Sequence, residues 1–551
     1  MHPVFFSRLL LALALATLPI SASSAEANSP APRVARSEAT ALELEVEAAL
    51  TSILMRSNEL QDQLDRLMKE RSGLEQEAAK LKALYESASS WTEQPEAMGS
   101  MAPLTSSSAL ILPVVRPSNQ KKAVERPNGT STLEAPLSLR IGAAEFTPGG
   151  FMAFTTAFRS TNMGSGVATS FGTVPFSNTA SGKLSEIRLG GQASRMNLKV
   201  TSHPGNTAVT GYVEADFMGT TPTNANVTSN SYTLRMRMFY GDIQLGKWEV
   251  GAGQAWSLLA PNRLGLSLAP GDVGLPGGAD PNYQVGFVWA RDPQARIIYH
   301  ASDRLALGVS LENPNQFIGS GVVLPAGLPP TEVDNGSNVA TPSLHPDIVV
   351  KAAYDTMFSG RAFHAEVAGL LTSFRIVNPA SSVRSTKSGG GVSLNLRVEP
   401  VRNLRLIANS FLSDGGGRYN AGLGPSLMVR QDLTVSPVRA ASLMGGVEYQ
   451  LGPQWGAYGY YGLVYFARNI DGSGRNIVGF GAPNSGGCAN RTIQEPTAGL
   501  TRIFWKSPAM GALQMNVQYS YLVRMPWWVS VGTPGSAHSH MVISELRYVL
   551  P

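Results

Sequence analysis

The sequence predicts an all-β transmembrane barrel of about sixteen antiparallel strands, preceded by an α-helical coiled coil. Two observations predict the barrel. Apolar and polar residues alternate along most segments between Leu137 and Pro551, and the connections between these segments are alternately short and long. A third observation predicts the coiled coil, because aliphatic residues recur every seven positions upstream of the barrel.

Residues 1–25 have the pattern of a secretory signal peptide. His2 and Arg8 form a short basic region, an apolar run extends from Leu9 to Ile20, and small residues precede a cleavage site after Ala25. The alternative is a retained membrane anchor. It is disfavoured because the run has about 12 residues, whereas a spanning helix needs about 20. We therefore expect export and cleavage after Ala25.

Residues 41–86 predict a coiled coil. One seam, spaced by seven, is wholly aliphatic and consists of Val46, Ile53, Leu60, Leu67, Leu74 and Leu81. The companion seam contains two interruptions, Ser57 and Arg71, which we interpret as fixing the register. A lone amphipathic helix is the alternative, but no neighbouring apolar segment offers it a surface. The coiled coil implies an oligomer.

Residues 87–136 predict a linker. Prolines interrupt a segment rich in Ser, Thr and Ala that has no sustained periodicity. This linker would connect the coiled coil to the barrel of residues 137–551.

Sixteen candidate strands follow in residues 137–551. They are 150–159, 185–202, 207–218, 231–242, 246–256, 283–300, 303–312, 346–357, 362–375, 388–399, 402–412, 438–451, 455–467, 494–505, 510–523 and 538–550. The long connections include 160–184, 257–282, 313–345, 413–437 and 468–493. Short turns on one side of the membrane and long loops on the other are typical of outer-membrane barrels. In 185–202 the basic residues change face, which predicts a bulge near Gly190-Gly191.

Composition and charge limit the function. Residues 1–137 hold 13 basic and 16 acidic residues, so 31 of the 44 basic and 23 of the 39 acidic residues remain for the barrel. This positive excess predicts attraction of anionic solutes or of lipopolysaccharide. Nucleic acid is not expected as a partner, because the arginines are scattered along strands. The single cysteine, Cys488, excludes an intrachain disulfide.

Charged residues on the polar faces are the candidate pore-lining and solute-contacting residues. They are Arg188, Arg195, Lys199, Glu214, Asp216, Arg235, Arg237, Arg263 and Arg291. The guanidinium fork of arginine pairs well with carboxylates, so these residues favour carboxylate-bearing solutes. Alternatively, Arg235 and Arg237 form structural salt bridges with Glu214 and Asp216 on the adjacent strand. The loop 257–282 is the candidate constriction if it folds inward, and a mobile external loop if it does not.

No catalytic site, metal site or cofactor is expected. Seven histidines are scattered without metal-ligand spacing, although His300 lies near Ser302, and His538 and His540 flank Ser539. These Ser and His neighbours leave open a third reading, an outer-membrane hydrolase.

The chain resembles the DcaP-like family of trimeric outer-membrane porins. The resemblance rests on four motifs in the family's order, 211–217 (GYVEADF), 234–237 (LRMR), 251–257 (GAGQAWS) and 291–296 (RDPQAR), together with the upstream coiled coil. It implies a sixteen-stranded homotrimeric barrel in the outer membrane of a Gram-negative bacterium, with an arginine-bearing constriction that passes anionic compounds. One departure is the C-terminus, which ends in Pro551 where such barrels usually have an aromatic residue.

We therefore expect a porin for small, anionic solutes, with its coiled coil in the periplasm and its wall in contact with outer-membrane lipid and lipopolysaccharide. The alternative is a structural barrel that tethers the envelope through its coiled coil.

Overall fold

The computed structural model describes residues 137–551, except 220–231, 338 and 475, and six residues of the N-terminal region. These six are helical: Met55, Asp62, Asp65, Lys69, Gly73 and Gln76. The predicted signal peptide and linker lie outside the described residues, as does most of the predicted coiled coil. Among the described residues, no helix is long and apolar enough to cross a membrane.

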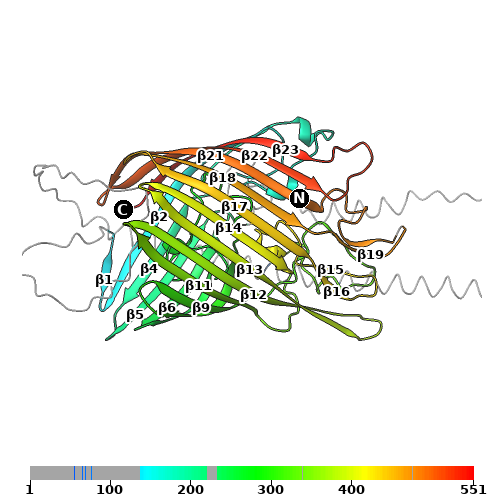
Figure 1. Ribbon diagram of the computed structural model, residues 1–551, viewed down its shortest axis with the longest axis horizontal. Helices are drawn as coiled ribbons and strands as arrows, with labels where there is room; N and C mark the ends of the chain where they lie inside the picture. The colour runs from blue at the N-terminus through cyan, green and yellow to red at the C-terminus, as the bar shows by residue number, and fades with distance from the viewer. Residues whose placement is uncertain are drawn as a thin grey trace, which may run out of the picture. The chain divides into compact units, whose positions relative to one another are not determined.

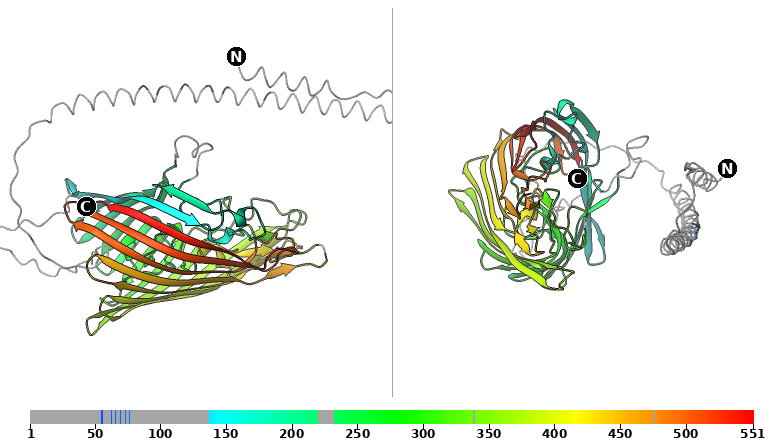
Figure 2. Two further views of the ribbon diagram at one scale, coloured as in Figure 1. Left: turned by 90° about the horizontal axis from the view of Figure 1, so that it is seen from above. Right: turned by 90° about the vertical axis from the view of Figure 1, so that its right-hand side faces the viewer.

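The barrel wall is a closed antiparallel sheet with sixteen strand positions, each of which overlaps a predicted strand. It closes where β2 pairs with β23. Figure 1 shows the tilt of these strands, and the end-on view of Figure 2 shows the wall surrounding loop segments. The strands are β2 (Ala144–Arg159), β3 (Glu186–Gly190), β4 (Arg195–Ser202), β5 (Thr207–Asp216), β6 (Arg235–Leu245), β7 (Trp248–Trp256), β8 (Arg291–His300), β9 (Leu305–Glu312), β11 (Asp347–Phe358), β12 (Arg361–Val377), β13 (Arg384–Val401), β14 (Leu404–Asp414), β17 (Arg439–Gln450), β18 (Trp455–Phe466), β21 (Asn490–Ser507), β22 (Gly511–Pro526) and β23 (Ala537–Val549).

Strands β3 and β4 occupy one position in the wall. Both pair with β2, in succession, and the chain between Gly190 and Arg195 leaves the ladder. The irregularity predicted near Gly190-Gly191 is therefore present, and it changes the face register. Arg188 in β3 lies on the same face as the buried Glu186, while Arg195 in β4 pairs with the inward-facing Asp216. The basic residues of this segment consequently share the inner face.

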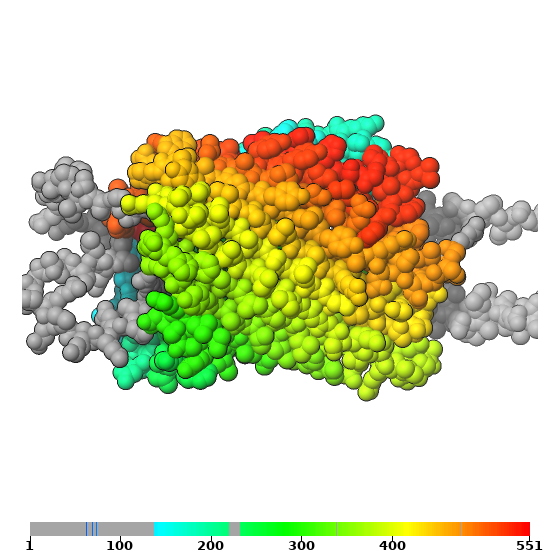
Figure 3. All heavy atoms as spheres, in the orientation of Figure 1, coloured from blue at the N-terminus to red at the C-terminus, as the bar shows by residue number. Residues whose placement is uncertain are grey.

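The faces of the wall are opposite in polarity to those of a soluble protein. On β13, Leu394 is 56% exposed while its neighbour Asn395 is 5% exposed. The same pattern repeats around the barrel, with aliphatic and aromatic side chains outside and amides, hydroxyls and charges inside. Figure 3 shows the continuous outer surface that these strands form. This arrangement is stable only where hydrocarbon covers the outer face.

Strand β6 departs from the predicted alternation. Its pairing with β5 shifts register at one point, because Glu214 pairs with Met238 while the next residue, Ala215, pairs with Met236. Arg237 is therefore the extra residue of a bulge. In the sequence, Met238 and Tyr240 continue the apolar series of Leu234 and Met236, which predicts that they share its outer face, and this prediction is wrong. Both are buried, at 1% and 5% exposure, and Phe239 is 58% exposed. A bulge adds one residue to a strand and so exchanges the faces beyond it.

Short turns join the strands at one end of the barrel and long loops at the other. The long loops contain short strands that the sequence did not predict, β10 (Val322–Val323), β15 (Leu427–Val429), β16 (Val435–Pro437), β19 (Asn469–Asp471) and β20 (Val478–Phe480). They lie at the end opposite the C-terminus (Figure 1). Side chains from several loops pack into apolar clusters there, with Phe171, Phe480 and Val435 almost fully buried. The short strand β1 (Leu139–Ile141) pairs with β2.

Candidate channel constriction

The connection between β7 and β8 is the candidate constriction, here called the inner loop and comprising residues 257–290. The sequence predicted a loop over 257–282 and a strand from 283, but β8 begins only at Arg291, so the predicted strand start is wrong. Tyr283 and Phe287 suggested a strand, yet both are buried against the loop itself and the inner wall. The inner loop is thus eight residues longer than predicted.

The inner loop enters the barrel and is hydrogen-bonded to one side of the wall through backbone amides. Leu258 N donates to Glu312 Oε1 on β9 at 2.8 Å, and Gly265 N donates to Asp355 Oδ2 on β11 at 3.0 Å. Lys351 Nζ on β11, fully buried, donates to Ala260 O at 2.7 Å. Carboxylates that accept from backbone amides and a lysine that donates to a carbonyl fix the loop more strongly than neutral groups would.

The same loop is also bound to the opposite side of the wall. Gly277 N donates to the hydroxyl of Tyr460 on β18 at 2.7 Å, and Ala279 N donates to Gln518 Oε1 on β22 at 2.6 Å. Val285 N donates to Glu495 Oε2 on β21 at 3.0 Å. Since these strands belong to a different part of the wall from β9 and β11, the loop crosses the barrel interior. The inward alternative for this loop is confirmed.

Glycine permits the closest approach between loop and wall. A Cβ at Gly462 on β18 would lie 1.7 Å from the carbonyl oxygen of Val285. Gly286 meets the wall from the loop side, with φ of 81° and a hypothetical Cβ 2.2 Å from the carbonyl oxygen of Leu443. Only residues without a side chain fit at these two positions.

An arginine cluster forms beside the inner loop, on β4, β5, β6 and β8. Arg237 donates from Nε to Glu214 Oε1 at 2.5 Å and from Nη1 to Asp216 Oδ2 at 2.8 Å. Arg235 binds Asp216 through two parallel hydrogen bonds of 2.9 and 2.7 Å. The structure therefore contains the predicted salt bridges, in which Arg235 and Arg237 pair with Glu214 and Asp216 on the adjacent strand.

Two further arginines of the cluster lack an equivalent partner. Arg195 Nη1 lies 3.9 Å from Glu214, which already binds Arg237. Arg291 is within ion-pair distance of no carboxylate in the described part of the chain, and its guanidinium lies 5.2 Å from the ring centroids of Trp256 and Trp289. Arg195 Nε, Arg291 Nη1 and Trp289 Nε1 are buried without a hydrogen-bond acceptor among the described residues. Four guanidiniums and two carboxylates leave the cluster with a net charge of +2.

Tyr283 connects the inner loop to this cluster. Its hydroxyl accepts from Arg237 Nη2 at 3.1 Å and from Arg195 Nη2 at 3.5 Å. Burial raises the pKa of the hydroxyl, but the positive charges of Arg237, Arg195 and Arg291 lower it by more, so the pKa falls from 10.0 to about 8. Tyr283 also has a φ of 72°, which is uncommon for a residue with a side chain.

The other predicted site residues lie elsewhere. Arg188 lies toward the long-loop end, where it donates to Glu186 at 3.3 Å. Lys199 lies on the inner face of β4 toward the short turns, where its Cα pairs with Thr147 and Tyr212. Arg263 braces the inner loop by donating to the carbonyl oxygens of Val273 and Leu275. The structure thus assembles six of the nine predicted residues into one cluster.

Sequence reasoning missed a second basic group. Glu448 on β17 accepts from Arg397 at 3.4 Å and from Arg405 at 3.2 Å, and it interacts electrostatically with Arg263. Three basic groups around one carboxylate again leave a net positive charge. The signal was available, because Arg397 alternates with Leu394, Leu396 and Val398 in strand 388–399.

Carboxylates collect on another side of the inner loop. Asp272 on the loop interacts electrostatically with Glu249 on β7 and Asp355 on β11. Burial raises the pKa of Asp272, and the charges of Glu249 and Asp355 raise it further, to about 7. Two histidines flank these wall carboxylates, with His300 at 3.1 Å from Glu249 and His364 at 2.7 Å from Asp355.

Comparison with known proteins supports the fold. No family model and no curated protein sequence matches the chain. Among solved structures, the outer-membrane channel DcaP of Acinetobacter baumannii matches with a TM-score of 0.55 and 17% identity, over 74% of this chain and 98% of that one. An anion-selective porin from Comamonas acidovorans has a TM-score of 0.43 and 12% identity, over 74% and 100% of the two chains. The OmpF of Salmonella typhi has a TM-score of 0.39 and 12% identity, over 75% and 100%. The chain described here therefore has the sixteen-stranded antiparallel barrel fold found in the DcaP channel.

Proposed function

We propose that the protein is an outer-membrane porin through which small anionic solutes, such as carboxylates, diffuse. The observation that carries this proposal is the net positive charge of the arginine cluster beside the inner loop. Arg291 in particular has no carboxylate partner among the described residues, so its positive charge is not neutralised locally. An uncompensated positive charge beside the channel attracts anions and repels cations.

Paired and unpaired arginines have different roles in this proposal. Arg235 and Arg237 hold Glu214 and Asp216 and so shape the wall. Arg195 and Arg291 supply the positive potential that solutes meet. Multiple weak contacts are needed for passage, because a single tight site would stall transport.

Reversal potentials in planar bilayers test the anion preference. The full chain is reconstituted in a bilayer between unequal KCl concentrations. We expect a reversal potential of the sign that results when chloride is more permeant than potassium. The variant Arg291→Gln should shift this potential toward zero, since it removes one positive charge without leaving a carboxylate unpaired. Arg402→Gln, at an exposed position after the end of β13, is the matched control and should leave the potential unchanged. A cation preference in the wild-type protein would overturn the proposal.

The same proposal includes the setting of the barrel. Residues 1–25 direct export to the outer membrane of a Gram-negative bacterium, where lipid and lipopolysaccharide cover the wall. Residues 41–86 form a periplasmic coiled coil that supports a homotrimer. Size-exclusion chromatography with light scattering on the detergent-solubilised protein, with and without residues 28–136, tests whether the coiled coil stabilises the trimer.

An envelope-tethering function is the second candidate, because the aliphatic seam of residues 41–86 provides an association surface separate from the barrel. Deletion of residues 28–136 separates the candidates. If the deletion changes neither conductance nor envelope integrity, the protein acts as a porin alone. If conductance stays intact but envelope integrity is lost, tethering is favoured. The hydrolase reading gains no support from the geometry. Ser539 is fully buried on the inner face of β23, while His538 and His540 are exposed on the outer face.

A further inference from the structure

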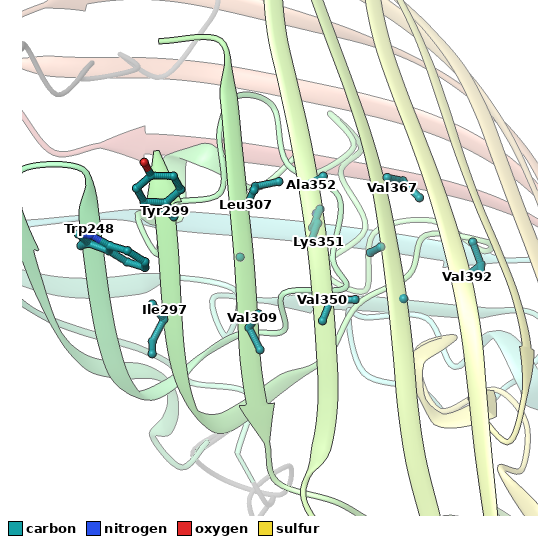
Figure 4. Close-up of a pocket in the computed structure, with 13 residues that line it drawn as sticks. Trp248, Ile297, Tyr299, Leu307, Val309, Val350, Lys351, Ala352, Val367 and Val392 are labelled. Atoms are coloured by element: carbon teal, nitrogen blue, oxygen red, sulfur yellow. The ribbon is translucent and has the colours of Figure 1, made fainter. Parts of the chain in front are cut away.

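The outer wall contains a groove of about 740 Å³, here called the outer groove. It crosses β7, β8, β9, β11, β12 and β13, and Figure 4 shows its labelled residues spread across these strands. Its lining is almost wholly apolar, with Ile297, Val309 and Val392 among the contributing side chains. A closed barrel is convex from outside, so a depression of this size in its wall requires a local cause.

The cause is a succession of small residues between larger ones. On the outer face, the small Ala352 of β11 lies between Leu307 of β9 and Val367 of β12 in neighbouring strands. One step along the strands, Gly369 of β12 lies between Val350 of β11 and Val392 of β13. In both rows the middle position lacks bulk, and the flanking side chains rise around it. The floor therefore consists of Ala352 and Gly369, and the aliphatic neighbours form the sides.

One end of the groove reaches the boundary between membrane and water. Trp248 and Tyr299 line this end with their ring centroids 4.6 Å apart, next to the short turns of the barrel. Aromatic residues at such positions lie at the level of lipid headgroups. Lys247 precedes Trp248 directly, is exposed, and donates to the carbonyl oxygen of Ala301 in the adjacent turn. A positive charge thus lies beside the aromatic end of an apolar groove.

We propose that the outer groove binds one phospholipid, with an acyl chain along its floor and an anionic headgroup near Lys247. The volume lies within the range of about 300–1,000 Å³ that small-molecule sites occupy. A second barrel fits the groove less well, because its convex wall would rest on the raised sides and leave the floor empty. A flexible acyl chain follows the floor, and the phosphate of the headgroup pairs with the lysine.

Native mass spectrometry of the detergent-solubilised full chain tests this proposal. The probe is phosphatidylglycerol with a dibrominated acyl chain, whose mass and isotope pattern identify it, and zwitterionic phosphatidylcholine with the same chain is the comparison lipid. We expect the wild-type protein to retain the phosphatidylglycerol, and Ala352→Phe to lose it because the new ring fills the floor. Ala295→Phe adds the same ring to the outer face of β8 outside the groove and should retain the lipid. Lys247→Gln should remove the preference for phosphatidylglycerol over phosphatidylcholine.

Each outcome decides the matter. Retention by Ala352→Phe equal to that of the wild type, or no retention by the wild type, would overturn the proposal. A change of oligomeric state in Ala352→Phe but not in Ala295→Phe would assign the groove to a second copy of the chain instead. If Ala352→Phe does not fold, the smaller Ala352→Leu is measured in the same way. The proposal does not depend on which solute the barrel passes.

Discussion

Gly462→Ala should detach part of the inner loop from the barrel wall. The added methyl group would lie 1.7 Å from the carbonyl oxygen of Val285, well inside van der Waals contact, so the loop backbone must move away from β18. That movement breaks two hydrogen bonds with Glu495, from Val285 N at 3.0 Å and from Gln284 Nε2 at 2.7 Å. Each hydrogen bond contributes about 0.5–1.5 kcal/mol, and leaving the fully buried Glu495 carboxylate without its amide adds about 1–3 kcal/mol. Docking of this segment should therefore weaken by about 2–6 kcal/mol.

Single-channel conductance in planar bilayers measures the consequence, because a detached loop obstructs the interior less. We expect larger and noisier conductance in Gly462→Ala than in the wild type, while the folded barrel keeps its heat-dependent mobility in SDS gels. Gly459→Ala on the same strand is the control, since its Cβ would meet nothing closer than 3.8 Å. Equal conductance in the wild type and both variants would refute the claim that the loop crosses the interior against β18.

Three other predictions concern the loops. Asp272 has a pKa raised from 3.8 to about 7 in the docked loop, so its contribution to docking is fully present only below pH 3.8 and is lost progressively as pH rises to about 7. Conductance should therefore rise between pH 3.8 and 7 in the wild type and stay level in Asp272→Asn. Tyr283 has a pKa lowered to about 8, so its ionisation above that pH adds negative charge to the arginine cluster. Anion preference should fall above pH 8 in the wild type and hold constant in Tyr283→Phe, as judged by reversal potentials. Arg418→Met should destabilise the folded barrel by about 3–5 kcal/mol in urea unfolding, because it leaves Asp292 and Asp347 unpaired in the interior.

The strands were predictable because lipid on one face and water or polar groups on the other impose a period of two. Each of the sixteen wall positions carries that period, including β13, where Leu394 and Asn395 point to opposite faces. The period is lost where a backbone irregularity exchanges the faces. A bulge at Arg237 leaves no mark in the residue types, so the faces of Met238 and Tyr240 were assigned wrongly.

The arginine cluster was predictable in its members and only partly in its pairing. Residues such as Arg195 and Glu214 lie on predicted inward faces of adjacent strands, and the register of those strands brings them together. Tyr283 was missed because it belongs to a loop whose path depends on contacts with strands more than a hundred residues away, such as that of Glu495. The spacing of aromatic residues in 283–290 is typical of a strand. In the structure these side chains pack inside the barrel as part of the inner loop, and the segment is not a strand of the wall.

The seam between β2 and β23 constrains the order of assembly. Phe151 pairs with Val549, so one edge of β2 stays without a partner along residues 151–159 until the final residues of the chain arrive, although β3 and β4 pair with its other edge much earlier. The inner loop likewise depends on late strands, because its contacts with β18, β21 and β22 involve residues 183, 210 and 239 positions further along the chain. Closure of the barrel and complete docking of the inner loop therefore both wait for the C-terminal strands.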